Sequence, residues 1–139
     1  FGDTALDGIY SMRYIHASSV CMSDDGSLYV VTFRDTAIVV GIYKSNHTQR
    51  FLLSSLIPDI ATHEFQNQYH KFYTPHDASF YGNNTVCLMD DGLGRPEGSC
   101  SSDEVKTCMS RAVCYTLNDK TKVVDLDWEF EYTHEFNGG

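Results

Sequence analysis

The sequence predicts an all-β chain made of repeated four-stranded antiparallel units. Two observations lead to this prediction. Alternation of apolar and polar residues, with β-branched and aromatic runs, dominates the chain, whereas apolar residues at helical spacing are rare. The order of features in the first half of the chain also returns in the second half, as expected of a repeat architecture.

The first half contains three predicted strands separated by turn residues. After the turn 24–26 (DDG), the segment 27–33 (SLYVVTF) alternates, and 36–43 (TAIVVGIY) is a β-branched run. Polar residues 44–48 separate this run from the third strand at 50–56 (RFLLSSL).

The second half follows the same plan. The turn 82–84 (GNN) precedes a strand at 85–90 (TVCLMD). Two more strands are expected at 111–117 (RAVCYTL) and 122–130 (KVVDLDWEF), with turn residues at 118–121 between them.

The repeat also extends to single residues. His16 and His76 each precede a serine three residues later, a short apolar stretch, a polar turn and a buried strand. Each half then reaches an arginine, Arg34 or Arg111, that opens the next strand. If the short apolar stretch after each histidine is counted as the first strand, each half closes with a fourth strand. Four strands in succession, repeated, predict blades of a β-propeller, in which each blade packs against its neighbours.

The blade-like units cover 16–56 and 76–130, with insertions at 58–73 and 93–109 that lengthen a compact blade of about 40 to 45 residues. In the first insertion, residues 60–69 lack alternation and predict a helical turn or an irregular loop. Residues 1–139 are therefore expected to form one partial propeller domain. Because closed propellers have about four to eight blades, further blades or other protein chains would complete it.

Composition limits the partners. Hydrophobic residues make up 42% of the 139 residues and aromatic residues 13%, as in a folded domain with a core. The formal charge of -9 argues against nucleic acid as a partner, and no apolar run reaches the length of a membrane span. No cofactor is predicted, and the absence of CxxC pairs argues against a metal site.

Five cysteines allow up to two disulfides and one free thiol, and Cys100 and Cys108 bracket a polar loop that a disulfide would close. The alternative is five buried thiols. Asn46 and Asn83 each begin an N-glycosylation triplet in a polar connection. Together these features predict a secreted or extracellular protein.

The innermost strand of each propeller blade lines the central channel, so the repeated residues are expected to converge there. His16, Arg34, His76 and Arg111 are the candidates for one polar cluster at the channel mouth. The alternatives are structural: His76 as a hydrogen-bonding residue where a strand begins, and Arg111 as an architectural residue paired with Asp90 or its neighbour Asp91.

The order of motifs resembles the arylsulfotransferase-like β-propeller family. The motifs are a His-x-x-Ser stretch from His16, a strand that ends at Arg34, then HDA from His76, LMDDG, SRA and WEF, and the similarity covers residues 9–132. The resemblance implies a six-bladed propeller when complete, with an active site in its channel. It also implies transfer of a sulfuryl group between phenols through a sulfated histidine, without a nucleotide sulfate donor.

Carried over to this sequence, the resemblance makes His76 the nucleophile and makes His16 and Arg34 the groups that hold the sulfate oxygens. The family often has asparagine two residues after the first histidine, where this chain has Ser18. Further residues are expected to contact the substrate, either the phenol ring or the groups around the reacting sulfur: Ser18, Phe72, Tyr73, Asp77 and Arg111.

Two functions are compatible with these residues. The first is an enzyme that moves a sulfuryl group from an aryl sulfate to a phenolic acceptor through a sulfohistidine at His76. The second is a catalytically silent extracellular glycoprotein of the same fold, used as a structural or binding module. The serine at position 18 favours the second function, because it removes an amide donor from the expected sulfate site.

Overall fold

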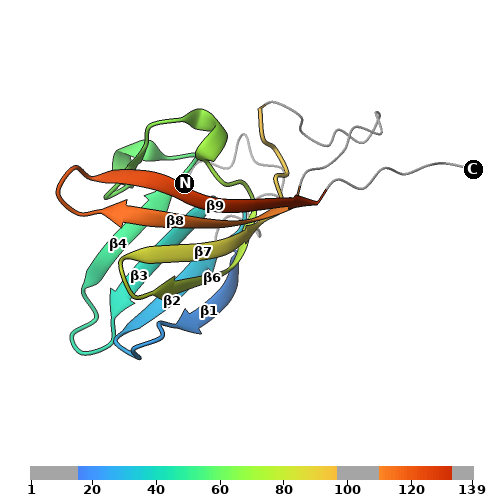
Figure 1. Cartoon of the computed structure of the whole chain (residues 1–139). Helices are drawn as coiled ribbons and strands as arrows, with labels where there is room; N and C mark the ends of the chain where they lie inside the picture. Colours follow the sequence, from blue (N-terminus) through green and yellow to red (C-terminus); the bar gives the residue numbers. More distant parts are fainter. Residues whose placement is uncertain (1–15, 97–109, 133–139) are drawn as a thin grey trace, which may run out of the picture.

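The computed structural model describes residues 16–96 and 110–132, and these residues form an all-β fold of two sheets (Figure 1). The first sheet is an antiparallel meander of four strands in the order β1-β2-β3-β4. Its strands are β1 (Ala17–Met22), β2 (Leu28–Phe33), β3 (Ile38–Tyr43) and β4 (Gln49–Ser54).

The second sheet has five strands in the order β5-β9-β8-β7-β6. Its strands are β5 (Glu64–Phe65), β6 (Pro75–Tyr81), β7 (Thr85–Asp90), β8 (Ser110–Asn118) and β9 (Val123–Tyr132). The four long strands form a second antiparallel meander, and β5 pairs in parallel with β9 at the edge. The prediction of an all-β chain is therefore confirmed, and the first sheet has the four antiparallel strands that were expected, whereas the second sheet has a fifth, parallel strand.

The connection between the sheets includes residues 60–69, for which the sequence predicts a helical turn or an irregular loop. The connection contains both. Two short 3-10 turns, η1 (Pro58–Ile60) and η2 (Gln68–His70), flank β5. The sequence did not predict β5, because two residues are too few to show any periodicity. Among the described residues, no helix is long and apolar enough to cross a membrane.

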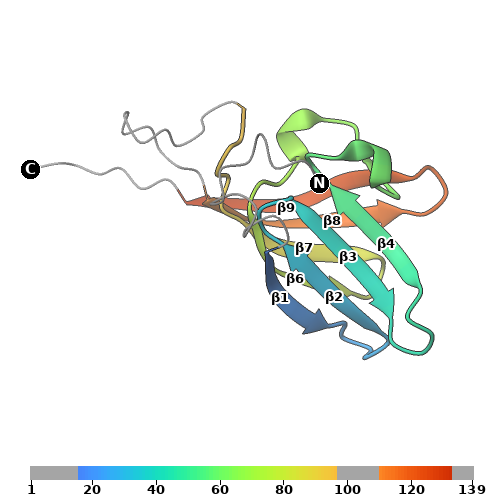
Figure 2. The same ribbon diagram turned by 180° about the vertical axis from the view of Figure 1, so that it is seen from behind.

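The two sheets pack face to face, and their strands cross rather than run side by side (Figure 2). Alternation in β2 and β8 sends every second side chain into the space between the sheets, where water is excluded. Phe51 of β4 stacks on Phe80 of β6 with ring centroids 5.5 Å apart, and Tyr115 of β8 is fully buried. One continuous core therefore joins the two halves of the chain.

The first strands of the two meanders, β1 and β6, lie next to each other. The Ser18 hydroxyl in β1 donates a hydrogen bond to the carbonyl oxygen of Pro75, at 3.2 Å. The amide of Ala78 in β6 donates to the Thr32 hydroxyl of β2, at 3.2 Å. The repeated histidines stand just before or at the start of these two strands, so the packing of the sheets brings the two repeats together.

Candidate functional site

A β-bulge follows each repeated histidine. The register of β1 against β2 shifts between Ala17 and Ser19, and the register of β6 against β7 shifts between His76 and Ser79. Asp77 in the second bulge has a φ of 50°, in the left-handed region that Asp tolerates better than most residues. Bulges change the direction of a strand locally, so the two chain segments that follow His16 and His76 share the same kind of irregularity.

Five side chains from both sheets meet beyond these bulges, and we call them the His76 cluster: His16, Arg34, Asp35, His76 and Asp91. Arg34 Nε lies 3.3 Å from His76 Nε2, although the two residues are 42 positions apart in the chain. Asp91 Oδ2 lies 2.9 Å from the same His76 nitrogen.

The other half of the cluster is organised by Asp35. Arg34 Nη1 donates to Asp35 Oδ1 at 3.0 Å, and His16 Nδ1 lies 3.6 Å from Asp35 Oδ2, within ion-pair range. The side chain of His16 is 51% exposed and that of His76 is 30% exposed, so a solute can reach both rings. The structure thus brings together the three residues predicted as catalytic, His16, Arg34 and His76.

Asp90, the residue before Asp91, is fully buried and accepts hydrogen bonds from several donors. Its carboxylate accepts from the backbone amides of Tyr73 at 2.7 Å and Gly92 at 3.0 Å, from Arg111 Nε at 2.9 Å, and from Arg95. The remaining nitrogens of Arg111 donate to Glu129 and to a backbone oxygen. Arg111 thus pairs with Asp90, as the architectural alternative predicted, and all three of its guanidinium nitrogens are engaged.

Phe72 and Tyr73, the aromatic side chains predicted to contact the substrate, are buried. Phe72 is fully buried, and Tyr73 is 7% exposed. Phe72 packs edge to face with Phe65, at 5.7 Å between ring centroids, and Arg95 lies over the Tyr73 ring at 5.7 Å. Burial raises the pKa of the Tyr73 phenol. Both rings therefore support the segment that leads into β6.

Two other predicted contact residues also have defined places. The Ser18 hydroxyl is directed at backbone oxygens of Pro75 and Thr32. Asp77 is exposed beside His76 in the bulge.

Two members of the cluster, Asp35 and Asp91, were not predicted from the sequence. Each had a local signal, because Asp35 directly follows Arg34 and Asp91 is the second acid of the DDG turn. Acidic turn residues are common, and their contacts with His16 and His76 depend on the stacking of two sheets.

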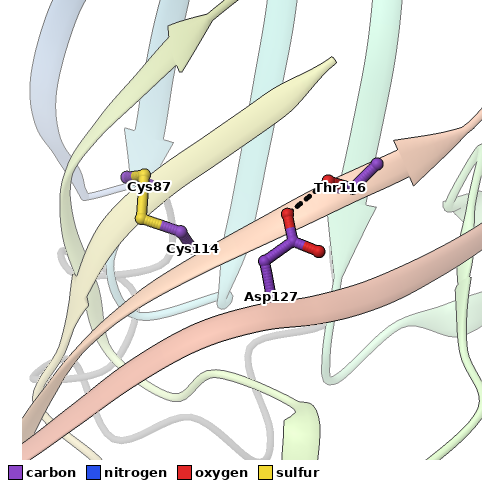
Figure 3. The surroundings of a disulfide bond; sticks show 4 residues. All are labelled: Cys87, Cys114, Thr116 and Asp127. Atoms are coloured by element: carbon purple, nitrogen blue, oxygen red, sulfur yellow. Dashed lines mark hydrogen bonds between the residues drawn. A yellow bond between two sulfur atoms is a disulfide. The ribbon is translucent and has the colours of Figure 1, made fainter. Parts of the chain in front are cut away.

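A disulfide joins Cys87 of β7 to Cys114 of β8, which face each other in the ladder (Figure 3). Next to it, the Thr116 hydroxyl of β8 donates to the Asp127 carboxylate of β9. This pairing was not predicted from the sequence, and the predicted Cys100–Cys108 bridge lies outside the described residues. Cys21 is a free thiol.

Both predicted glycosylation acceptors are exposed. Asn46 lies in the turn between β3 and β4, where its side-chain oxygen accepts from the Thr48 amide at 3.0 Å and from the Thr48 hydroxyl at 2.8 Å. Asn83 lies in the turn between β6 and β7 with a φ of 64°. Both asparagines are therefore accessible to a glycosylating enzyme.

In the part of the chain that the structure describes, no group of three or more His, Cys, Asp or Glu side chains is arranged to hold a metal ion. No family model matches this sequence, and no curated protein is significantly similar to it. The function proposed below therefore rests on the His76 cluster and on the motifs that surround it.

Proposed function

We propose that this chain supplies blades to an arylsulfotransferase-like β-propeller of six blades, completed by further blades or other chains. Its reaction would be the transfer of a sulfuryl group from an aryl sulfate to a phenolic acceptor, with His76 as the covalent nucleophile. Two features of the fold support the blade interpretation. Both long meanders have four antiparallel strands, and their first strands, β1 and β6, are adjacent, as the innermost strands of neighbouring blades would be.

One observation carries the proposal: Arg34 lies 3.3 Å from His76, and His16 joins them through Asp35. The motif resemblance points to these same three residues, which lie at positions 16, 34 and 76 of the chain. Chance placement on two sheets would not be expected to assemble all of them in one exposed cluster.

The chemistry of the cluster suits sulfuryl transfer. An imidazole is a good nucleophile at neutral pH, and a guanidinium matches the oxygens of a tetrahedral anion. Sulfuryl transfer resembles phosphoryl transfer, in which an enzyme mainly positions groups and stabilises charge on the transferred oxygens. Arg34, whose Nε lies 3.3 Å from the His76 ring, would supply positive charge near the transferred group.

The secreted location belongs to the same proposal. Disulfides persist in oxidising compartments, and the Cys87–Cys114 bridge together with the exposed acceptors Asn46 and Asn83 supports an extracellular glycoprotein.

A second function, a catalytically silent binding or structural module, is favoured by the charge of the cluster. With neutral imidazoles, one guanidinium on Arg34 stands against two carboxylates, on Asp35 and Asp91. This balance disfavours a sulfate anion. The Ser18 hydroxyl, directed at backbone oxygens, also contributes no amide donor to an anion.

The deciding experiment is mass spectrometry on the full-length protein after brief incubation with a chromogenic aryl sulfate. The proposal expects one sulfuryl group on the peptide that carries His76 and stoichiometric release of the phenol. His76→Ala should abolish both signals.

His47→Asn is the matched control, because His47 is an exposed turn residue with a φ of 59° that asparagine also adopts. This variant should keep the adduct. No adduct and no released phenol from the folded wild-type protein would overturn the enzyme and leave the binding module.

A further inference from the structure

The ring of His76 has two neighbours at one nitrogen. Asp91 Oδ2 lies 2.9 Å from Nε2, and Arg34 Nε lies 3.3 Å from the same atom. A carboxylate only accepts hydrogen bonds, and a guanidinium only donates them. Both contacts cannot be hydrogen bonds at once, because the first requires a proton on Nε2 and the second requires a lone pair there.

Asp91 lies on a backbone that its neighbours anchor. It follows Asp90, whose carboxylate is buried and fixed by two backbone amides and two arginines. Gly92, the next residue, has a φ of 71°, which turns the chain directly after Asp91. The DDG turn thus has two roles: its first acid anchors the end of β7, and its second acid is presented to His76.

The shorter contact to a charged acceptor is the stronger one. Arg34 also has another partner, since its Nη1 donates to Asp35 at 3.0 Å. The lowest-energy arrangement of the neutral ring therefore has the proton on Nε2, directed at Asp91, with Arg34 as a nearby charge.

From this geometry we propose that Asp91 is a positioning residue that fixes the tautomer of His76, so that Nδ1 carries the free lone pair and is the reacting nitrogen. The reaction step rests on the proposed sulfuryl transfer, whereas the tautomer does not. Among the described residues, no hydrogen bond occupies Nδ1, and the His76 side chain is 30% exposed.

In the first step, Nδ1 forms a bond to sulfur while the bond from sulfur to the aryl oxygen breaks, and its electron pair leaves on the phenolate. The ring becomes a sulfonated imidazolium whose Nε2 proton remains directed at the Asp91 carboxylate, which stabilises the new positive charge. In the second step, the acceptor oxygen attacks sulfur, its proton passes to solvent, and the nitrogen–sulfur electron pair returns to Nδ1.

The test is a ring-nitrogen NMR measurement on the full-length protein labelled with nitrogen-15 histidine. Pyrrole-type and pyridine-type nitrogens have well-separated shifts, and the signals of His76 are those that disappear in His76→Gln. In the neutral wild-type ring we expect a pyrrole-type shift at Nε2 and a pyridine-type shift at Nδ1.

Asp91→Ala should exchange the two shifts, because Arg34, an obligate donor, is then the remaining described partner of Nε2. Two variants serve as controls. Asp77→Asn removes a neighbouring carboxylate that does not hold the ring, and Arg34→Met removes the competing donor. Both should keep the wild-type pattern.

A pyrrole-type Nδ1 in the wild-type protein, or an unchanged pattern in Asp91→Ala, would overturn the proposal. The test also separates the two inferences. A protein with the proton on Nε2 but no sulfuryl adduct refutes the proposed function and leaves the role of Asp91 as the partner of His76 intact.

Discussion

Asp90 and Arg111 form a buried ion pair across β7 and β8, with Arg111 Nε 2.9 Å from Asp90 Oδ2. The two residues face each other in the strand register. Arg111 also donates to Glu129 of β9 and to the backbone oxygen of Lys71, before β6. One guanidinium thereby connects three strands and the segment that leads to His76.

Arg111→Met should destabilise the fold by about 3–5 kcal/mol, because it leaves the Asp90 carboxylate buried with fewer partners. Urea unfolding measures this change. Arg50→Met removes a more exposed pair, in which two Arg50 nitrogens donate to Asp119 and one also to Asn84, and should cost less than Arg111→Met because the Asp119 carboxylate it leaves behind is accessible to water. Equal losses in the two variants would contradict a special role for the buried pair.

The Cys87–Cys114 bridge joins residues separated by 27 positions and should contribute about 3.5 kcal/mol by restricting the unfolded chain. Digestion without reductant should yield peptides joined through these two cysteines. The double variant Cys87→Ala/Cys114→Ala should melt at a lower temperature than the wild-type protein, and reductant should narrow the gap. A different pairing in the digest would show the prediction to be wrong.

Stability should fall as the pH drops below about 6.5, the ordinary pKa of histidine. His63 is 1% exposed, and burial lowers its pKa in the folded state despite a contact with Asp119 at 3.3 Å. The unfolded chain therefore binds the proton first. The contribution of His63 is complete above the unfolded pKa and is lost below it, at no more than about 1.4 kcal/mol per pH unit.

Urea unfolding between neutral and mildly acidic pH measures this dependence. His63→Gln should flatten it in that window, whereas His47→Asn, in an exposed turn, should leave it unchanged. The same slope in all three proteins would refute the assignment to His63.

Gly41→Ala should be destabilising by about 1–3 kcal/mol through overpacking. A Cβ at position 41 would lie 2.3 Å from the ring of Phe51, which is fully buried between the sheets. Thermal unfolding measures the loss. Phe51→Leu in the same background should restore part of it by relieving the contact, and no restoration would point to a backbone cause.

Much of the fold could be predicted because alternation is a local property. The segment 27–33 alternates and β2 covers Leu28–Phe33, and the run 36–43 contains β3. The two-residue strand β5 could not be predicted, since only its pairing with β9 defines it. Cys87 and Cys114 were not paired either, because facing positions become visible only once strand register is known.

The sequence alone determined the strand class, the turns and the repeated histidine and arginine, since each depends on residue type and spacing within one unit. Only the tertiary structure decided which of these residues meet. Packing of β1 against β6 brings Arg34 to His76, and the buried Asp90 network presents Asp91 to the same ring. The physical reason is that these contacts join residues on different strands and sheets, and their energy depends on distances that no local pattern specifies.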